Sequence, residues 1–401
     1  MSCAFIIIMQ RIFKMKKALI VGGNSGMGLS MSLNLLSEGY GHVYIVGKEL
    51  PDVSDVPPQF KDTFLSNTTS HKIDLLTGDL SLFDSITDID TLIITCGFGR
   101  VAPFEELKER EVDNLIGCNL LAVVRLIERY YSRICSTEDF YTLVLGSIAG
   151  HVCSPLFSVY GAAKMGLCGF IENVNAELAA KGLSNRILDV SPGSVKNTRF
   201  AGGNNDVSAL MPLTEQMILR MREKQTLFIP DYEEIYKDVI RRYREDPMKF
   251  GVESYNYKMK ANRVDPKPQL VIGYLSGTFD LFHIGHLNLL KRARAQCDYL
   301  IVGVHESGSW KGKETFIPYE ERVEILRACK YVDRVVMSLP EDTDAYEEFK
   351  IHKLFVGSDY KGTERFRRYE EFFADKGVEI VYFPYTNGTS STQLREKLSK
   401  K

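Results

Sequence analysis

The sequence predicts an α/β protein with two doubly wound domains, each built around a parallel sheet. Residues 18–21 and 270–275 are short apolar strands, and each runs into a glycine-containing turn followed by a helix. After each opening, apolar runs alternate with amphipathic segments of helix length, which is typical of successive β-α-β units. The runs are continuously apolar, as expected of strands covered on both faces. The further strands expected are 43–46, 91–94, 141–145 and 186–190 in the first domain and 299–304, 334–337, 353–356 and 379–383 in the second.

Length and composition agree with a chain of more than one globular domain. The chain has 401 residues, of which 44% are hydrophobic and 25% charged, and its formal net charge is −2. The length favours two or three domains, and the charge gives no support for binding to nucleic acid or membranes through net charge. The eight cysteines lie far apart without a C-x-x-C pair, which favours reduced thiols in a cytoplasmic enzyme.

The boundary between the domains is expected near residue 260. The segment 246–269 is polar and carries Pro266 and Pro268 ahead of a new strand, which is typical of a linker. We therefore expect a first domain at 16–255, a linker at 256–269 and a second domain at 270–401. Residues 1–15 are an uninformative extension whose apolar run is too short for a signal peptide, and no stretch reaches the roughly 20 apolar residues of a membrane span.

Three glycines with G-x3-G-x-G spacing follow the first strand directly and open a helix. Missing side chains let the backbone approach a pyrophosphate, and the helix N-terminus offers N–H groups and a positive dipole end. The turn predicts a dinucleotide site, although glycine-rich turns between strand and helix are also common without one. The residues expected to contact the cofactor here are Gly22, Asn24, Ser25, Gly26, Met27 and Gly28.

A second constellation in the same domain consists of Ser147, Tyr160 and Lys164. Tyr160 and Lys164 are four residues apart and so share one face of a helix. A phenol has a pKa of about 10 and needs a nearby cation to act as an acid at neutral pH. Lys164 can supply that charge and hold the nicotinamide ribose, while Ser147 can bond to a substrate carbonyl. Taken alone, a Tyr-x-x-x-Lys pair is more often incidental.

With their flanking residues these motifs resemble the classical short-chain dehydrogenase/reductase family over residues 16–200. The order of Ser147-Ile-Ala-Gly150, Tyr160-Gly-Ala-Ala-Lys164 and Ser191-Pro-Gly-Ser-Val195 is that of the family. The resemblance implies a Rossmann fold in which Tyr160 protonates a carbonyl oxygen as hydride arrives from a nicotinamide. It also implies a fourth catalytic residue, Asn119, and the further cofactor contacts Asp74, Pro192 and Gly193.

Two segments depart from the family pattern. The family's Asn-Asn-Ala-Gly after the fourth strand is Ile94-Thr-Cys-Gly97 here, which keeps the backbone path but loses polar support. The second strand is followed by Val46-Gly-Lys-Glu49, without an acid at the position that binds the ribose hydroxyls of NAD. Lys48 therefore favours NADPH, and the adjacent Glu49 leaves NADH open.

The segment 277–286, Gly-Thr-Phe-Asp-Leu-Phe-His-Ile-Gly-His, is the strongest single motif of the chain. His283 and His286 stand three apart at the start of a helix, where both can face one phosphate. Nucleotidyl transfer needs positioned groups that stabilise charge on phosphate oxygens, and two imidazoles suit that task. A His-x-x-His zinc pair is the alternative, but no third ligand with sensible spacing is evident.

This domain resembles the cytidylyltransferase branch of the HxGH nucleotidyltransferases, most closely the glycerol-3-phosphate cytidylyltransferases, over residues 271–398. The resemblance implies that Lys313 and Arg322 hold phosphates, and Lys313 joins the two histidines as a catalytic residue. The contacts to CTP that it implies are Gly277, Thr278, Phe279, Asp280, His283, His286, Arg322, Asp359, Thr386, Gly388, Ser390, Ser391 and Thr392. Tyr385 replaces the family's arginine ahead of the last segment. Mg²⁺ should bridge the triphosphate, with Asp280 as a candidate ligand, and the preference for CTP over ATP rests on the resemblance alone.

Together the two domains predict a bifunctional enzyme. NADPH would reduce a ketose phosphate to an alditol phosphate, and CTP would convert the product to a CDP-alditol of ribitol, arabinitol or glycerol type for cell-surface polymers. Three alternatives stay open: the reductase half acts on a later nucleotide-linked sugar, it is a nucleotide-binding oligomerisation scaffold, or the transferase uses ATP and a non-sugar phosphate. Expected partners are small molecules, with neither nucleic acid nor membrane, and family habit favours a homo-oligomer, either dimer or tetramer.

Overall fold

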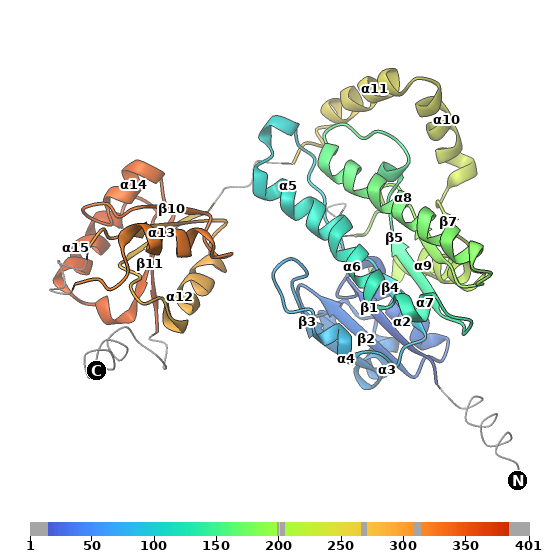
Figure 1. The fold of residues 1–401 in the computed structure, drawn as a ribbon. Helices are drawn as coiled ribbons and strands as arrows, with labels where there is room; N and C mark the ends of the chain where they lie inside the picture. The colour runs from blue at the N-terminus through green and yellow to red at the C-terminus, as the bar shows by residue number, and fades with distance from the viewer. Residues whose placement is uncertain (1–14, 199, 201–204, 266–270, 308–313, 385–401) are drawn as a thin grey trace, which may run out of the picture. The chain divides into compact units, whose positions relative to one another are not determined.

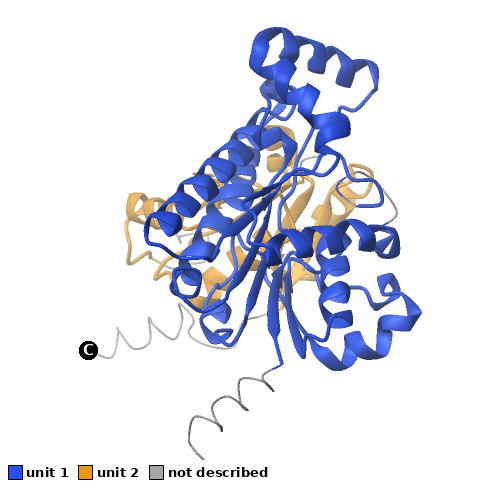
Figure 2. Cartoon of the chain, turned by 90° about the vertical axis from the view of Figure 1, so that its right-hand side faces the viewer, with its two compact units in different colours: residues 1–266 blue, residues 267–401 orange. Residues whose placement is uncertain are grey.

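The computed structural model describes residues 15–198, 200, 205–265, 271–307 and 314–384 of the chain (Figure 1). The chain separates into two compact units, Met1–Pro266 and Lys267–Lys401, which we call unit 1 and unit 2 (Figure 2). Each unit holds one parallel sheet with helices packed against it. The predicted class of two doubly wound α/β domains is confirmed. No helix in the described ranges is long and apolar enough to cross a membrane.

Unit 1 contains a seven-stranded parallel sheet in the order β3-β2-β1-β4-β5-β6-β7. Ile20 of β1 is in register with Ile45 of β2 on one side and with Ile93 of β4 on the other. The strands are β1 (Lys17–Val21), β2 (His42–Gly47), β3 (Thr68–Lys72), β4 (Thr91–Ile94), β5 (Tyr141–Leu145), β6 (Ile187–Val190) and β7 (Leu227–Phe228). The α-helices are α2 (Gly26–Ser37), α3 (Lys61–Asn67), α4 (Leu82–Ser85), α5 (Glu109–Ile116), α6 (Ala122–Arg129), α7 (Tyr131–Ile134), α8 (Ser158–Ala180), α9 (Val207–Arg222), α10 (Lys237–Glu245) and α11 (Pro247–Lys260). Shorter helical turns are η1 (Val53–Asp55), η2 (Pro58–Phe60), η3 (Phe104–Glu106), η5 (Ile148–Gly150) and the π-helical η4 (Gly117–Leu121) and η7 (Tyr232–Tyr236).

Two apolar layers hold this sheet between its helices. One layer joins the strands to α2 and α9, where Leu33 and Met217 are fully buried. The other joins the opposite face to α6 and α8 through Leu126 and Leu167. Full burial of such a side chain stabilises the fold by about 1.5–3 kcal/mol, which explains why the central strands are mostly apolar. Their buried polar exceptions include Thr91, Thr142 and Asp189.

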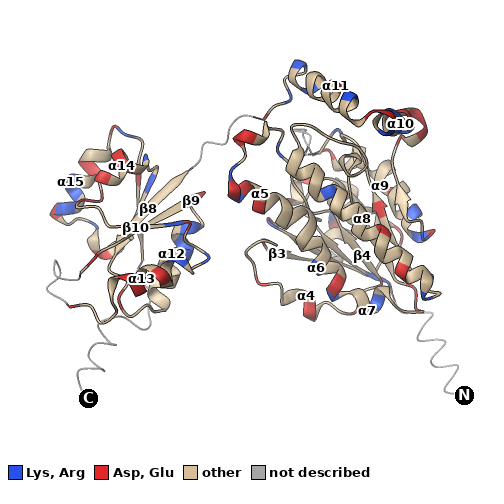
Figure 3. Cartoon of the chain, turned by 45° about the horizontal axis from the view of Figure 1, so that its top comes forward, with Lys and Arg blue, Asp and Glu red and all other residues tan. Residues whose placement is uncertain are grey.

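Unit 2 contains a five-stranded parallel sheet in the order β10-β9-β8-β11-β12. The strands are β8 (Ile272–Gly277), β9 (Tyr299–Val304), β10 (Arg334–Met337), β11 (Lys353–Gly357) and β12 (Glu379–Phe383). The helices are α12 (Ile284–Arg294), α13 (Tyr319–Arg327), α14 (Asp344–Phe349), α15 (Glu364–Phe373) and the 3-10 turn η9 (Ser358–Tyr360). Leu290 of α12 and Leu326 of α13 anchor one apolar layer, while Ala345 of α14 and Phe373 of α15 anchor the other. Charged residues of both signs are interspersed along the helices of both units (Figure 3).

The sequence analysis missed two strands of unit 1, both at the edges of its sheet. β3 is polar, with the sequence Thr-Thr-Ser-His-Lys, and none of its residues is buried. β7 has two residues, one exposed and one half-buried. An edge strand with one exposed side need not be apolar, so β3 lacks the pattern on which the prediction relied. β7 is apolar, Leu227-Phe228, but it is too short to show that pattern. Helix α11 ends at Lys260, so residues 256–260 of the expected linker are helical.

Candidate functional site

The glycine turn of unit 1 follows β1 and begins α2. Gly22 has a φ of +94°, and a Cβ there would lie 2.6 Å from the Cys96 amide nitrogen beyond β4. A Cβ on Gly28 would lie 2.4 Å from the Gly22 carbonyl oxygen. Both positions therefore exclude every larger residue. The predicted cofactor turn thus brings the end of β1, the residues after β4 and the first turn of α2 into close contact.

The other residues of this turn lie around the N-terminus of α2. Ser25 is the N-cap residue but makes no capping hydrogen bond through its side chain, and Met27 packs against the apolar layer below. Asn24 lies against Gly47 at the end of β2. The Gly26 amide donates a 2.7 Å hydrogen bond to Oδ1 of Asn205, a buried residue at φ +54° just before α9. The sequence analysis did not single out Asn205, because no motif links it to the turn.

Lys48 and Asp74 lie together at the carboxyl ends of β2 and β3. The Lys48 ammonium is 3.5 Å from the Asp74 carboxylate, and the lysine side chain is 77% exposed. Glu49 instead pairs with Lys72, at 2.5 Å. Glu49, which left NADH open as the cofactor in the sequence analysis, is therefore paired with Lys72. Lys48 is the cation next to the end of β2. An exposed pair of this kind contributes little to stability.

Tyr160 and Ser147 come together between α8 and the end of β5. Ser147 is the N-cap of η5, and its Oγ accepts a 3.1 Å hydrogen bond from the Ala149 amide. Tyr160 is 7% exposed, and its ring lies 5.2 Å from that of Phe157 and 5.7 Å from that of Phe200. Burial raises the pKa of Tyr160, and a hydrogen bond with Ser147 acts in the opposite direction.

Lys164 lies one helical turn beyond Tyr160 in α8 and is buried. Its ammonium donates a 2.8 Å hydrogen bond to the Leu145 carbonyl and lies 5.8 Å from the centre of the Tyr160 ring. Burial lowers the pKa of Lys164. The lowering of the phenol's pKa by this lysine stays a prediction, since burial is the main influence on the pKa of Tyr160 and the ammonium bonds to the Leu145 carbonyl.

Asn119 is fully buried in the π-helical turn η4, between α5 and α6. Its Nδ2 donates to the Phe98 and Leu115 carbonyls, at 2.8 and 2.9 Å, while its Oδ1 has no hydrogen-bond partner. A Cβ on Gly97 would lie 2.6 Å from that Oδ1 and 3.6 Å from the Lys164 nitrogen. Gly97, the residue of the family's Asn-Asn-Ala-Gly segment that this chain keeps, therefore leaves no space for a side chain next to Asn119.

Pro192 and Gly193 follow β6 and border the same region. The Pro192 carbonyl accepts a 2.9 Å hydrogen bond from the Ile148 amide, next to Ser147. Gly193 packs so closely on the Tyr236 phenol that a Cβ there would lie 1.6 Å from its oxygen. Tyr236 belongs to an apolar cluster with Ile240 of α10. The sequence analysis named neither Tyr236 nor Ile240 as a site residue.

In unit 2 the two predicted histidines lie at the start of α12. His283 is the N-cap residue, and its Nδ1 accepts a 3.0 Å hydrogen bond from the Gly285 amide. This bond places the ring proton on Nε2, so Nε2 is a donor. The His283 and His286 rings stack with centroids 4.0 Å apart. Burial lowers the pKa of His283, which keeps the imidazole neutral at pH 7.

The turn before the histidines is shaped by Phe279 and Asp280. Phe279 is buried at φ +54°, and its ring packs against Gly277 and lies 5.3 Å from the His286 ring. Asp280 is 3% exposed, and its carboxylate accepts hydrogen bonds from the Phe316 and Ile317 amides, at 2.9–3.2 Å. Asp280 therefore fixes the segment ahead of α13, a different task from the metal ligation considered for it.

Arg322 has contacts that differ from those expected. Its side chain is 1% exposed, and the guanidinium donates hydrogen bonds of 2.5–2.9 Å to backbone carbonyls. The acceptors are the carbonyls of Thr278, His305, Glu306 and Ile317. These bonds join the turn after β8 to the segments after β9 and before α13. In this structure Arg322 builds the site rather than facing an open phosphate position, because its donors are directed at the backbone.

The remaining predicted contacts to CTP are separate from the histidine pair or lie outside the described residues. Asp359 is exposed in η9, after β11. Arg365 of α15 is held by the Tyr369 hydroxyl at 2.7 Å and by Asp342 at 3.4 Å. The residues outside the described ranges are Lys313, Thr386, Gly388, Ser390, Ser391 and Thr392.

Comparisons with known proteins match the two units to different families. Residues 16–207 match the short chain dehydrogenase family, and residues 274–397 match the cytidylyltransferase-like family. Glycerol-3-phosphate cytidylyltransferase of Staphylococcus aureus is 35% identical over 126 residues, covering 30% of this chain and 90% of that protein. The 3-oxoacyl-[acyl-carrier-protein] reductase FabG of S. aureus is 26% identical over 185 residues, covering 45% of this chain and 74% of that protein. A solved bulky-bulky ketone specific alcohol dehydrogenase from Comamonas testosteroni covers 59% of this chain and 94% of its own, at 21% identity and a TM-score of 0.48.

Proposed function

The chain joins a short-chain dehydrogenase domain to a domain that belongs to the cytidylyltransferase family, and on this premise we propose a bifunctional enzyme with two consecutive reactions. The first reduces a ketose phosphate with NADPH to an alditol phosphate. The second transfers CMP from CTP to that phosphate, which gives a CDP-alditol. The observation that carries the proposal is the presence, in one chain, of a Ser-Tyr-Lys group whose Tyr160 and Lys164 are buried and of a His-x-x-His helix N-terminus.

In the reduction, the bound nicotinamide supplies a hydride to the carbonyl carbon. Tyr160 gives its phenolic proton to the carbonyl oxygen, and Ser147 donates a hydrogen bond to the same oxygen. The raised pKa of Tyr160 keeps it protonated at neutral pH, so the acid is present in its active form. Lys164, whose ammonium donates to the Leu145 carbonyl here, would hold the ribose of a bound cofactor and stabilise the phenolate of Tyr160.

The residues at the α2 turn fit a dinucleotide. Gly22 and Gly28 leave the backbone accessible where any side chain would clash, and the α2 N-terminus is suited to a pyrophosphate. An anion at the Gly26 amide would take the place of the Asn205 oxygen that now accepts from it. Lys48 is placed to pair with a 2′-phosphate, which supports NADPH as the cofactor.

In the transfer, an oxygen of the alditol phosphate attacks the α-phosphorus of CTP, and the bond to the β-phosphate breaks to release pyrophosphate. The Nε2–H of His283 donates to a phosphate oxygen that gains charge in this step, and His286 beside it does the same. Because burial keeps His283 neutral, positive charge has to come from Mg²⁺ and basic residues such as Lys313. No nearby carboxylate is assigned to Mg²⁺, since Asp280 is engaged by two amides.

The scaffold alternative for unit 1 is disfavoured by the burial of Lys164. A buried ammonium is costly, and a domain that only bound a nucleotide would gain nothing from keeping it beside Tyr160 and Ser147. The 3% exposure of Lys164 is therefore better explained by catalysis.

The test is an incubation of the pure protein with NADPH, CTP, Mg²⁺ and a series of ketose phosphates of three to six carbons, with NADPH loss and pyrophosphate release followed together. One ketose phosphate should drive both signals. If pyrophosphate appears only with a ready-made alditol phosphate and no ketose phosphate oxidises NADPH, the consecutive scheme is wrong.

A further inference from the structure

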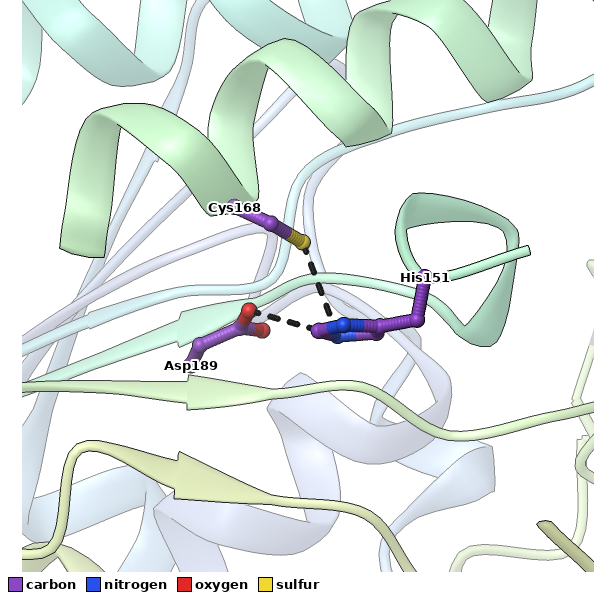
Figure 4. A group of neighbouring side chains, drawn as sticks. All are labelled: His151, Cys168 and Asp189. Atoms are coloured by element: carbon purple, nitrogen blue, oxygen red, sulfur yellow. Dashed lines mark hydrogen bonds and ion pairs between the residues drawn. The ribbon is translucent and has the colours of Figure 1, made fainter. Parts of the chain in front are cut away.

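A group of three potential metal ligands lies beside the Ser147 loop in unit 1. His151 directly follows η5, Cys168 lies on α8, and Asp189 lies on β6. One ligand atom from each of them lies within 4.8 Å of the others. Figure 4 shows the three side chains directed toward one another from their separate elements. Because the elements belong to the packed core of unit 1, their arrangement is fixed by the fold.

His151 lies at hydrogen-bonding distance of the Cys168 thiol and at ion-pair distance of the Asp189 carboxylate, and both spacings also suit ligands that share one ion. His151 Nε2 lies 3.7 Å from Asp189 Oδ2 and 3.7 Å from Cys168 Sγ. A nitrogen-to-oxygen hydrogen bond is about 2.7–3.2 Å long. Zinc bonds of about 2.0–2.3 Å in a tetrahedral arrangement place neighbouring ligand atoms about 3.4–3.7 Å apart. The two distances from His151 Nε2 are therefore close to the spacing of neighbouring ligands around a zinc-sized ion, and all three ligand atoms lie within 4.8 Å of one another.

Two glycines leave room for the ligand groups. A Cβ on Gly146 would lie 2.2 Å from Asp189 Oδ1, and a Cβ on Gly150 would lie 2.5 Å from Cys168 Sγ. Any larger residue at either position would displace a ligand. The side chain of Asp189 is 6% exposed and that of His151 is 20% exposed, so the group is enclosed, with access from the histidine side.

We propose that His151, Cys168 and Asp189 bind one Zn²⁺ ion at a site separate from both reaction centres. The mixture of one sulfur, one nitrogen and one oxygen ligand suits the borderline-soft Zn²⁺. Cys168 binds as the thiolate and releases its proton to solvent as the ion enters. The two negative charges of Cys168 and Asp189 then balance the ion, so the enclosed site is neutral. Water or the nearby Ser191 hydroxyl completes four ligands.

The site acts on the reductase through the backbone of Ser147. The Ser191 hydroxyl donates to Asp189 Oδ1 at 2.8 Å and accepts from the Ser147 amide at 3.1 Å. An ion that fixes Asp189 therefore also fixes Ser191 and the start of η5. This assigns the ion a structural role, and its binding stabilises the folded chain by mass action.

The experiment uses the full chain, freed of metal with a chelator and titrated with Co²⁺ as a spectroscopic substitute. A thiolate-to-cobalt charge-transfer band should saturate at one equivalent, and Cys168→Ser should abolish it. The matched controls are Cys135→Ser, which removes a thiol that contacts Lys181 away from the group, and His283→Ala, which removes an imidazole of unit 2. Both controls should keep the band.

Two further measurements decide the case if Cys168→Ser does not fold. His151→Gln should weaken Zn²⁺ binding by at least tenfold in competition with a coloured chelator, since even residues behind the ligands change affinity by about 10–100-fold. Zn²⁺ should raise the melting temperature of the metal-free wild-type chain and of Cys135→Ser, but not that of His151→Gln. The absence of a saturable band, or equal Zn²⁺ affinity in His151→Gln and wild type, would overturn the proposal.

Discussion

The two units both place a helix N-terminus after their first strand, but they prepare it for phosphate by different means. In unit 1 the turn from β1 to α2 depends on missing side chains, since Gly22 and Gly28 have no space for a Cβ. In unit 2 the turn from β8 to α12 depends on a side chain that is present, because His283 caps the helix through Nδ1 and keeps its ring proton on Nε2. The first arrangement suits an anion that must be held, and the second suits an anion whose charge changes during reaction.

The largest effect should come from Tyr160→Phe, which removes the proton donor of unit 1. Loss of a general acid costs about 10²–10⁴-fold in rate, so NADPH oxidation with a ketose phosphate should fall by that factor. Pyrophosphate release from a ready-made alditol phosphate should be unchanged. Equal slowing of both reactions by this variant would contradict the account, because the two sites would then not be independent.

His283→Ala should have the opposite effect: it should slow the transfer reaction and leave the reduction unchanged. Removing one donor to a developing oxyanion costs about 10²–10³-fold, and here the loss should appear in pyrophosphate release. NADPH oxidation by the same preparation should match wild type. His283→Gln, which keeps a donor at this position, should recover part of the rate. Full activity in His283→Ala would show that His283 takes no part in the transfer reaction.

Gly28→Ala tests whether the turn of unit 1 acts through its backbone. The added Cβ would meet the Gly22 carbonyl at 2.4 Å, so the turn has to open. NADPH affinity should fall by more than tenfold without loss of the CTP reaction. Gly169→Ala is the control, because it adds a methyl group to α8 with nothing within 4 Å. Unchanged NADPH binding in Gly28→Ala would show that the turn does not hold the cofactor.

Arg322→Lys tests whether this residue supports the turn of unit 2 or contacts the substrate. Lysine cannot reach the same carbonyls with a fork of donors, and each buried polar group left unpaired costs about 1–3 kcal/mol. Unit 2 should therefore unfold at lower denaturant concentration, while the KM for CTP of the folded fraction changes little. A large rise in the KM for CTP at unchanged stability would show that Arg322 contacts a phosphate, as the sequence implies.

The smallest effect is expected from Lys48→Ala. This exposed lysine pairs with Asp74 at 3.5 Å, so its removal should leave stability nearly unchanged. The KM for NADPH should rise severalfold and that for NADH should not, which measures how much Lys48 selects the cofactor. Equal changes for both cofactors would show that Lys48 does not read the 2′-phosphate.

The central strands and the candidate groups of both units could be predicted because their signals are local. Tyr160 and Lys164 lie one helical turn apart, and the histidine pair sits on one turn. The edge strand β3 could not be predicted, since its exposed side removes the apolar pattern.

Contacts between distant segments were also beyond the sequence. Asn205 reaches Gly26 across 179 residues, and His151, Cys168 and Asp189 meet only because η5, α8 and β6 are adjacent in the fold. The backbone contacts of Arg322 could not be predicted for a related reason, and its contact with a phosphate stays a prediction. An arginine in sequence looks the same whether it faces a phosphate or four backbone carbonyls, and only burial distinguishes them.

The most direct test of the consecutive scheme follows a hydrogen atom from one unit's reaction to the other's product. The wild-type chain is incubated with CTP, Mg²⁺, the preferred ketose phosphate and NADPH deuterated at the transferred position, and products are analysed by mass spectrometry. The scheme predicts a CDP-alditol that carries one deuterium, and no pyrophosphate when the reductant is omitted. A CDP-linked product without deuterium, or pyrophosphate release from the ketose phosphate in the absence of NADPH, would contradict it.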